Sequence, residues 1–129
     1  MLYKDITDKI IKAFFNVYNK LGFGFLENVY EKSICIELQK MGLTVYPQSP
    51  IRIYYDEELV GLYYADILVE DRVIVELKAT DTIIEKHEAQ LLNYLKATEI
   101  EIGLLLNFGH KAEFKRKIFE NRYKNRVIM

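Results

Sequence analysis

The stretch that decides the fold is YYADILVEDRVIVELKAT, residues 63–80, which has the pattern of two apolar strands joined by a short turn. Three charged residues interrupt this pattern: Asp66, Glu76 and Lys78. A charged side chain in an otherwise buried strand costs several kcal/mol unless it is paired with an opposite charge or bound to a metal ion. These three residues therefore need an explanation that packing alone does not supply.

Side-chain alternation separates the two faces of this hairpin, because successive residues of a strand point to opposite sides of the sheet. We expect the three charged residues on one face. The other face is apolar and consists of Ala65, Ile67, Val69, Val73, Val75 and Leu77. Counting back from a turn at Glu70–Asp71 brings Asp66 and Glu76 opposite each other within one residue of register, and a bulge or an odd-length turn would align them fully.

Two carboxylates at this separation repel each other unless a cation lies between them. Carboxylate oxygens completed by water are suitable ligands for Mg²⁺ or Mn²⁺. Lys78 points into the same space as Glu76, where it can orient or deprotonate a water molecule, or stabilise charge on a phosphate. The set favours metal-assisted hydrolysis of a phosphodiester. The alternative is an Asp/Glu–Lys ion pair on a solvated sheet face.

The rest of the chain shows the periodicity of helices and further strands. Helices are predicted over residues 5–21, 26–41 and 83–97, and strands over 43–48, 50–55, 59–70, 72–79, 101–108 and 111–119. Asp5 or Thr7 is expected to cap the first helix, and the glycines of GFGF at 22–25 to end it. This order of elements indicates an α/β or α+β fold with a mixed central sheet flanked by helices.

Composition limits the class of protein. The 129 residues fit one domain spanning 1–129, and half of them are hydrophobic, which is enough for a core at this size. A single cysteine, Cys35, excludes a disulfide framework or a multi-cysteine metal site within one chain. The net charge of −1 excludes a protein that binds nucleic acid through positive charge spread over its whole surface, so any such binding needs a local patch. With no apolar stretch of membrane-spanning length and no signal-peptide core, we expect a cytoplasmic protein.

The spacing AD, nine residues, ELK resembles the core motif of the PD-(D/E)XK nuclease superfamily. The resemblance implies a restriction-endonuclease-like fold in which Asp66 and Glu76 bind a divalent metal and Lys78 assists catalysis. Ala65 stands where the signature has proline. That position is variable in the superfamily and is not a ligand, so the departure weakens the match little.

GFLENVY, which reads Gly24-x-x-Glu27-x-x-Tyr30, resembles the signature of a small prokaryotic family called GxxExxY, which is placed in the same superfamily. The resemblance covers nearly the whole chain and implies that Glu27 lines the site and contacts the metal, often through water. The alternative for Glu27 is a charge favoured by the helix dipole. Tyr30 lies one turn later, as a pocket residue or, alternatively, as a core aromatic with its hydroxyl at the surface.

Gln90 and Tyr94 are four residues apart and share one face of the third predicted helix. A Gln-x-x-x-Tyr pair after the Glu-x-Lys strand resembles the recombination-type exonuclease branch of the superfamily. There the pair helps to shape the site and contacts nucleic acid. His87, one turn before Gln90, is either a ligand or substrate contact or a partly buried structural histidine.

A basic segment at residues 111–126 is the sequence's candidate for phosphate contacts. It holds seven lysines and arginines against two glutamates: Lys111, Lys115, Arg116, Lys117, Arg122, Lys124 and Arg126, with Glu113 and Glu120. The alternative is a solvated strand and tail.

Three functions remain open at this stage: a Mg²⁺- or Mn²⁺-dependent nuclease acting on DNA or RNA, a catalytically silent module of the same fold that binds nucleic acid or a protein partner, and a hydrolase for another phosphate-containing substrate. The sequence leaves the oligomeric state open, a dimer included.

Overall fold

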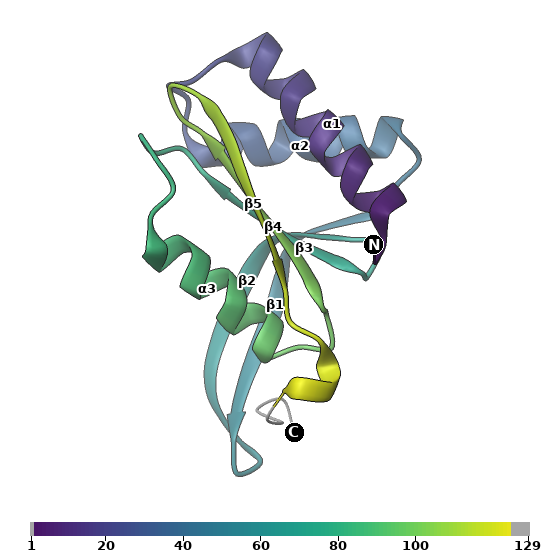
Figure 1. The fold of residues 1–129 in the computed structure, drawn as a ribbon, viewed down its shortest axis with the longest axis vertical. Coiled ribbons are helices and arrows are strands. Elements are labelled where there is room, and N and C mark those ends of the chain that lie inside the picture. The colour runs from purple at the N-terminus through teal and green to yellow at the C-terminus, as the bar shows by residue number, and fades with distance from the viewer. Residues whose placement is uncertain (1, 125–129) are drawn as a thin grey trace.

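Helices cover both faces of one five-stranded sheet in the computed structural model, which describes residues 2–124 (Figure 1). Helices α1 (Lys4–Leu21) and α2 (Glu27–Lys40) pack on one face through the larger apolar core. Helix α3 (Glu85–Lys96) packs on the other face through a second core. The α+β fold with a mixed sheet, predicted from the sequence, is confirmed.

The sheet has the order β1-β2-β3-β4-β5. Its strands are β1 (Val45–Tyr55), β2 (Glu58–Val69), β3 (Val73–Lys78), β4 (Ile102–Phe108) and β5 (Ala112–Ile118). Strands β3 and β4 are parallel and are joined by the crossover through α3, whereas the other neighbours are antiparallel. Every residue of β4 is buried, as its continuous apolar sequence predicts for a strand covered on both faces.

Helix α1 forms because its apolar residues recur at helical spacing, and Ile10, Phe14 and Val17 are buried against the sheet. The predicted cap was wrong. Helix α1 begins at Lys4, after a left-handed Tyr3 that makes no side-chain capping bond. Thr7 is instead buried in the helix, where its hydroxyl donates to the carbonyl of Lys4 at 3.2 Å.

The edge strand β1 is longer than predicted. The strands expected over 43–48 and 50–55 form one strand, because pairing with β2 continues across Gln48, which has a φ of 53°. Pro47 lies on this outer edge, where its missing N–H removes no ladder bond. Asp56 and Glu57 both have positive φ and form the tight two-residue turn to β2.

Only the last part of β2 pairs with β3. The β2–β3 ladder runs from Val69↔Val73 to Ile67↔Val75, and the preceding residues of β2 pair with β1 alone. The two strands therefore extend together beyond the sheet as a two-stranded arm, here called the β1–β2 ribbon and comprising residues 49–65 (Figure 1).

We expected from alternation that Ala65 and Ile67 would lie on the same face of the sheet, and this prediction was wrong. It packs in the second core, with Ile74 and α3, whereas Ile67 packs in the first. The reason is that β2 has left β3 at this point and follows the twist of the ribbon. The break in the alternation falls at Asp66, which becomes the start of the candidate site.

Candidate active site

The turn between β2 and β3 sets Asp66 across from Glu76. The turn contains three residues, 70–72, because Val69 pairs with Val73. One further step beyond the last pair, Ile67↔Val75, makes Asp66 the counterpart of Glu76. The odd-length turn considered from the sequence is therefore present. Since the ladder stops at that step, the Asp66 carboxylate lies beside β3 and accepts the N–H of Leu77 at 2.7 Å.

Glu76 is a buried carboxyl group with an unused oxygen. Its side chain is 5% exposed, and its Oε1 has no hydrogen-bond partner within residues 2–124. Burial, followed by the neighbouring Asp66, raises the pKa of Glu76 to about 10. A divalent cation relieves this arrangement, because it attracts both carboxylates and uses the unbonded oxygen.

The donor set fits a hard divalent ion of the Mg²⁺ type. Such an ion keeps several waters and takes only one or two carboxylates from the protein. Asp66 and Glu76 supply these two. No group of three or more histidine, cysteine, aspartate or glutamate side chains converges into a metal cage anywhere in the described part of the chain. The candidate ligands are thus a pair of carboxylates, with Glu27 as an additional acidic group nearby.

Lys78 ends β3, is half-buried and lies opposite Asn107 of β4. The ion pair considered from the sequence is absent, because Lys78 takes part in none of the salt bridges formed among residues 2–124. Its positive charge still lowers the pKa of Glu27 against the larger effect of burial, which raises that pKa. Lys78 is therefore a cation that acts on two acidic groups, Glu27 and Glu76, and forms a salt bridge with neither.

The start of α2 brings Glu27 to the same place. Glu27 is the first residue of α2 and, with Asp66, lines a cavity of about 210 Å³. Burial raises the pKa of Glu27, and the charge of Asp66 raises it further. Glu31, one helical turn on, also lines this cavity and accepts a hydrogen bond from Gln48 at 2.6 Å. Sequence reasoning missed Glu31, although its four-residue spacing from Glu27 was the available signal.

Tyr30 supports this arrangement from the core rather than lining a pocket. It is fully buried, and its ring stacks on Phe108 with centroids 4.0 Å apart. Its hydroxyl donates to the carbonyl of Gly22 at 2.6 Å and accepts the N–H of Phe25 at 3.2 Å. Tyr30 therefore ties the glycine-rich loop that leads to Glu27 to the core, as the core aromatic considered from the sequence would.

Gln90 and Tyr94 line a second, larger cavity of about 600 Å³ between α3 and the β1–β2 ribbon. Tyr94 is 6% exposed. Burial raises the pKa of Tyr94 to about 12, with further contributions from the charges of Glu76 and Asp66. Tyr94 also packs in the second core with Ala65 and Ile74, the strand residues next to Asp66 and two before Glu76, so it connects the larger cavity with the part of the sheet that carries the carboxylates.

His87 has a structural contact. Its Nδ1 accepts the N–H of Ile84 at 3.2 Å and so helps to cap α3. Burial lowers the pKa of His87, and the charges of Lys78 and Lys86 lower it further. The lowered pKa agrees with the role of Nδ1 as a hydrogen-bond acceptor at the helix start.

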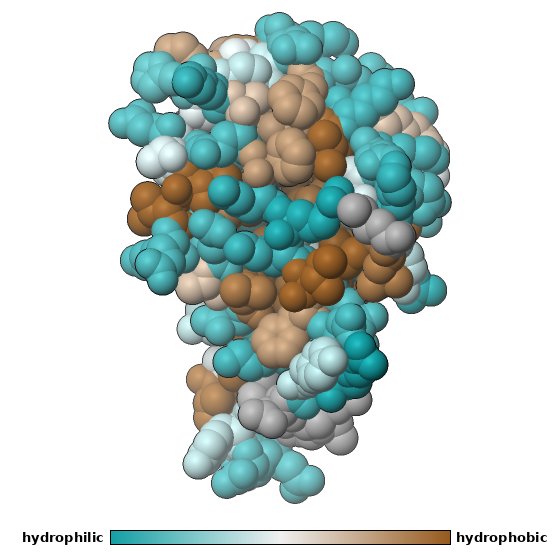
Figure 2. Space-filling model, viewed as in Figure 1, coloured by the Kyte–Doolittle hydropathy of each residue, from teal (hydrophilic) through white to brown (hydrophobic). Residues whose placement is uncertain are grey.

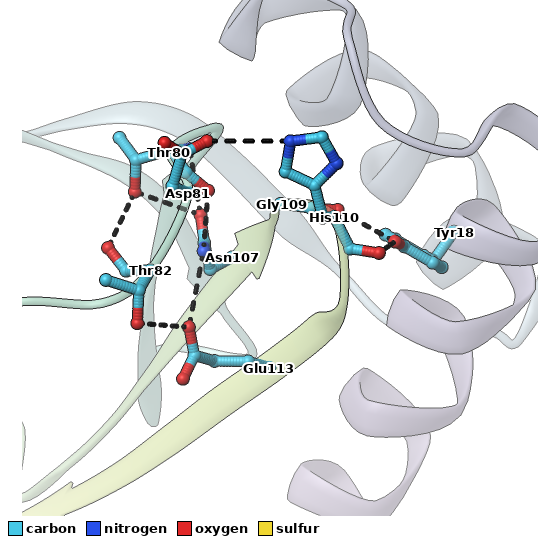
Figure 3. A network of polar contacts seen from close by, with 8 residues as sticks. All are labelled: Tyr18, Thr80, Asp81, Thr82, Asn107, Gly109, His110 and Glu113. Carbon is cyan, nitrogen blue, oxygen red and sulfur yellow. Dashed lines mark hydrogen bonds and ion pairs between the residues drawn. The ribbon is translucent and has the colours of Figure 1, made fainter.

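A polar network that sequence reasoning missed holds the loop between Lys78 and α3 (Figure 3). Asn107 is fully buried in β4, where its Oδ1 accepts the N–H of Thr80 at 3.0 Å and its Nδ2 donates to the carbonyl of the same residue at 2.9 Å. Glu113 of β5 accepts the N–H of Ile83 at 2.9 Å and the hydroxyl of Thr82 at 3.3 Å. The available signal was one asparagine within an apolar strand.

Gly109 allows this loop to approach the end of β4. A Cβ at this position would lie 2.4 Å from the carbonyl oxygen of Thr80. The carbonyls of Gly109 and His110 accept the hydroxyl of Tyr18 from α1 at 2.7 and 2.8 Å (Figure 3). Residues 79–84 are thus fastened on one side to β4 and β5, so the network positions both Lys78 before the loop and α3 after it.

The basic segment 111–126 does not form a uniform cationic surface. Lys117 pairs with Glu88 at 2.6 Å, and Arg122 pairs with Glu120 at 2.7 Å. Lys124 is 8% exposed and donates to two backbone carbonyls. Figure 2 shows hydrophilic side chains forming a band across the face that carries α3 and β5.

Only part of this segment is exposed and positively charged. Lys111 and Lys115 are exposed, and Arg126 lies outside the described residues. Strand β5 is also separated from β2 and Asp66 by β3 and β4. Binding of nucleic acid through this segment stays a prediction.

Comparison with known proteins agrees with this geometry. A family model described as the PD-(D/E)XK nuclease superfamily matches residues 4–117, and the chain belongs to that superfamily. No curated protein matches the chain.

The solved structure titled "Crystal structure of SSO0001" is similar in fold, with a TM-score of 0.54 and 14% sequence identity. The match covers 72% of this chain and 50% of that one, so this chain spans about half the length of that protein. Across residues 2–124, no helix combines the length and the apolar character that crossing a membrane requires.

Proposed function

We propose that this protein is a metal-dependent nuclease that hydrolyses phosphodiester bonds of DNA or RNA. The observation that carries the proposal is the buried Glu76 carboxyl, set beside Asp66 and with one oxygen unbonded within residues 2–124. In the proposed site, Asp66 and Glu76 hold Mg²⁺ or Mn²⁺, and Glu27 holds a water at its edge. The ion would supply Lewis-acid stabilisation of the phosphate.

In this proposal Lys78 is the catalytic side chain that does not bind the metal. Its ammonium orients the attacking water and supplies positive charge where negative charge develops on the phosphate oxygens. Support for this role comes from its place at the end of β3 and from the absence of an ion pair to Lys78 among residues 2–124. In this proposal Gln90 and Tyr94, which belong to α3 and line the neighbouring larger cavity, bound the site on that side.

We also propose that the chain is a member of the GxxExxY family. The structural support is that each motif residue has a distinct role in one loop. Gly24 has a φ of 109°, which other residues rarely adopt, Glu27 begins α2, and Tyr30 ties the loop to the core. The step of three residues from Glu27 to Tyr30 corresponds to about one turn of the helix that starts at Glu27.

The test is a cleavage assay with labelled single- and double-stranded DNA and RNA, with Mn²⁺ or Mg²⁺ or with a chelator. The Lys78→Ala variant should lose about 100-fold or more of the rate, as expected when a charge that acts in the transition state is removed. Lys40→Ala, at an exposed site at the end of α2, is the matched control and should cleave at the normal rate. Equal rates for Lys78→Ala and the unsubstituted protein would overturn the catalytic assignment.

A silent module is the second candidate, favoured by the apolar surface of the β1–β2 ribbon. Tyr55, Leu59 and Leu62 are 70%, 55% and 48% exposed there, as in a surface that a protein partner covers. Calorimetric titration separates the two candidates. Heat from Mn²⁺ binding that disappears in Asp66→Asn supports the nuclease, and no heat at millimolar Mn²⁺ supports the silent module.

A further inference from the structure

The larger cavity is a groove with an aromatic wall. One side is formed by the β1–β2 ribbon and the other by α3, and its volume of about 600 Å³ is in the range of ligand sites. Tyr63 of the ribbon is 50% exposed, and its ring centroid lies 5.9 Å from that of Tyr94 at an interplanar angle of 45°. A Cβ on Gly61 would lie 3.3 Å from the Tyr63 ring, so the ring rests closely on the strand.

The charged residues that line the groove are both cationic. Lys86 and Lys96 lie near the two ends of α3, about 15 Å apart along the helix axis, and none of the carboxylates within residues 2–124 lines the groove between them. Two lysines flanking an aromatic wall suit an occupant that carries negative charges at intervals along a chain and flat groups between them. Gln90, on the same helix face, adds an amide that can donate to or accept from such a group.

The groove adjoins the two carboxylates through Tyr94, which lines the groove and packs in the second core with Ala65, the chain neighbour of Asp66, and with Ile74, two residues before Glu76 on β3. A chain lying along α3 would therefore reach the phosphodiester site. Bases within a duplex are already stacked on each other, so an aromatic wall can stack only on unpaired bases. The aromatic wall, the two lysines and the position beside the carboxylates therefore favour single-stranded over double-stranded nucleic acid.

The geometry points to a single-strand binding groove, in which an unpaired base stacks on Tyr63 while Lys86 and Lys96 hold the flanking phosphates. This inference rests on the proposed nuclease function for the reason that the groove adjoins that site. It adds the form of nucleic acid that the protein takes: a single-stranded segment or an unpaired end.

Fluorescence anisotropy tests the groove with a labelled single-stranded oligonucleotide and the duplex of the same sequence. The full chain carries Lys78→Ala and a chelator is present, so that cleavage cannot interfere. We expect the single strand to bind about tenfold more tightly than the duplex. Tyr63→Ala in this background should weaken single-strand binding about tenfold, because it removes one stacking surface.

The matched control is Tyr55→Ala, a tyrosine of the same ribbon that is 70% exposed and does not line the groove. It should bind as the parent does. Lys96→Ala is a second, independent variant. It should weaken binding and reduce the slope of log Kd against the logarithm of the salt concentration by about one. Thermal melting of each variant checks the fold, and Tyr63 and Lys96 are exposed enough for their replacement to leave it intact.

Equal binding of single strand and duplex, or equal effects of Tyr63→Ala and Tyr55→Ala, overturns the groove. Failure to bind any oligonucleotide also overturns the proposal, and a peptide segment would then be the occupant to test. The nuclease proposal fails separately. Tyr63-dependent binding by a protein that never cleaves supports the groove without the enzyme, whereas normal cleavage of single strands by Tyr63→Ala supports the enzyme without the groove.

Discussion

Two regions attract attention in the sequence because of their charges, and the fold treats them in opposite ways. In the hairpin, Glu76 is buried with an unbonded oxygen, and Lys78 makes no salt bridge among residues 2–124. In the basic segment, Lys117 and Arg122 pair with nearby glutamates. The hairpin keeps the Glu76 carboxyl group buried with one oxygen unbonded, whereas the segment places Lys117 and Arg122 in ion pairs and leaves Lys111 and Lys115 exposed to solvent. A buried carboxyl group beside a second carboxylate, and not the number of charges, marks the candidate site.

The largest expected difference is between one glutamate from each region. Glu76→Gln should abolish Mn²⁺ binding in calorimetry and reduce cleavage about 100-fold or more, because it removes the charge of one of two candidate ligands. Glu120→Gln, which breaks only the surface pair with Arg122, should leave both quantities within about twofold. Undiminished Mn²⁺ binding by Glu76→Gln would contradict the contrast between the regions.

The network that fastens the loop after Lys78 should have an intermediate effect. Asn107→Leu removes the two hydrogen bonds to the backbone of Thr80 from a fully buried position, and should lower the free energy of unfolding by about 2 kcal/mol in urea denaturation. Asn19→Leu, at an exposed site on α1, is the control and should change stability by less than about 0.5 kcal/mol. If both variants unfold at the same urea concentration, the network does not hold the loop.

The pH dependence of stability should reveal Glu113. The N–H of Ile83, followed by Asn107 and Thr82, lowers the pKa of the Glu113 carboxyl in the folded protein. Its stabilising effect is therefore present above the ordinary carboxyl pKa and is lost as pH falls through the lowered value. We expect Glu113→Gln to lower the melting temperature by a few degrees at pH 7 and to have progressively less effect below pH ~4. A difference that is constant from pH 7 to pH 3 would refute this assignment.

The smallest effect should come from the ion pair of the basic segment. Lys117→Ala removes a partly exposed pair with Glu88 and should shift the urea midpoint only slightly, with the shift shrinking in high salt. Cleavage should remain within about twofold of normal. A loss of cleavage comparable to that in Lys78→Ala would mean that β5 belongs to the site and would break the comparison.

Much of the fold could be predicted because its signals are local. The three helices follow from apolar spacing, and the fully buried β4 follows from a continuous apolar run. The cap of α1 and the division of β1 were mispredicted, since a left-handed Tyr3 and a left-handed Gln48 are held by contacts elsewhere in the fold. Local rules describe the average residue, and these two positions depart from it.

The sequence by itself determined that Asp66 and Glu76 lie across one hairpin within one residue of register, with Lys78 two residues beyond Glu76, because strand period and approximate turn position depend on neighbouring residues. The structure decided the three-residue turn that makes Asp66 the counterpart of Glu76. The tertiary structure alone decided that α2 delivers Glu27 to Asp66, that Asn107 holds the loop after Lys78, and that Tyr30 is a support in the core. It also decided that Lys117 pairs with Glu88. Each of these depends on packing between segments far apart in the chain, which no local period encodes.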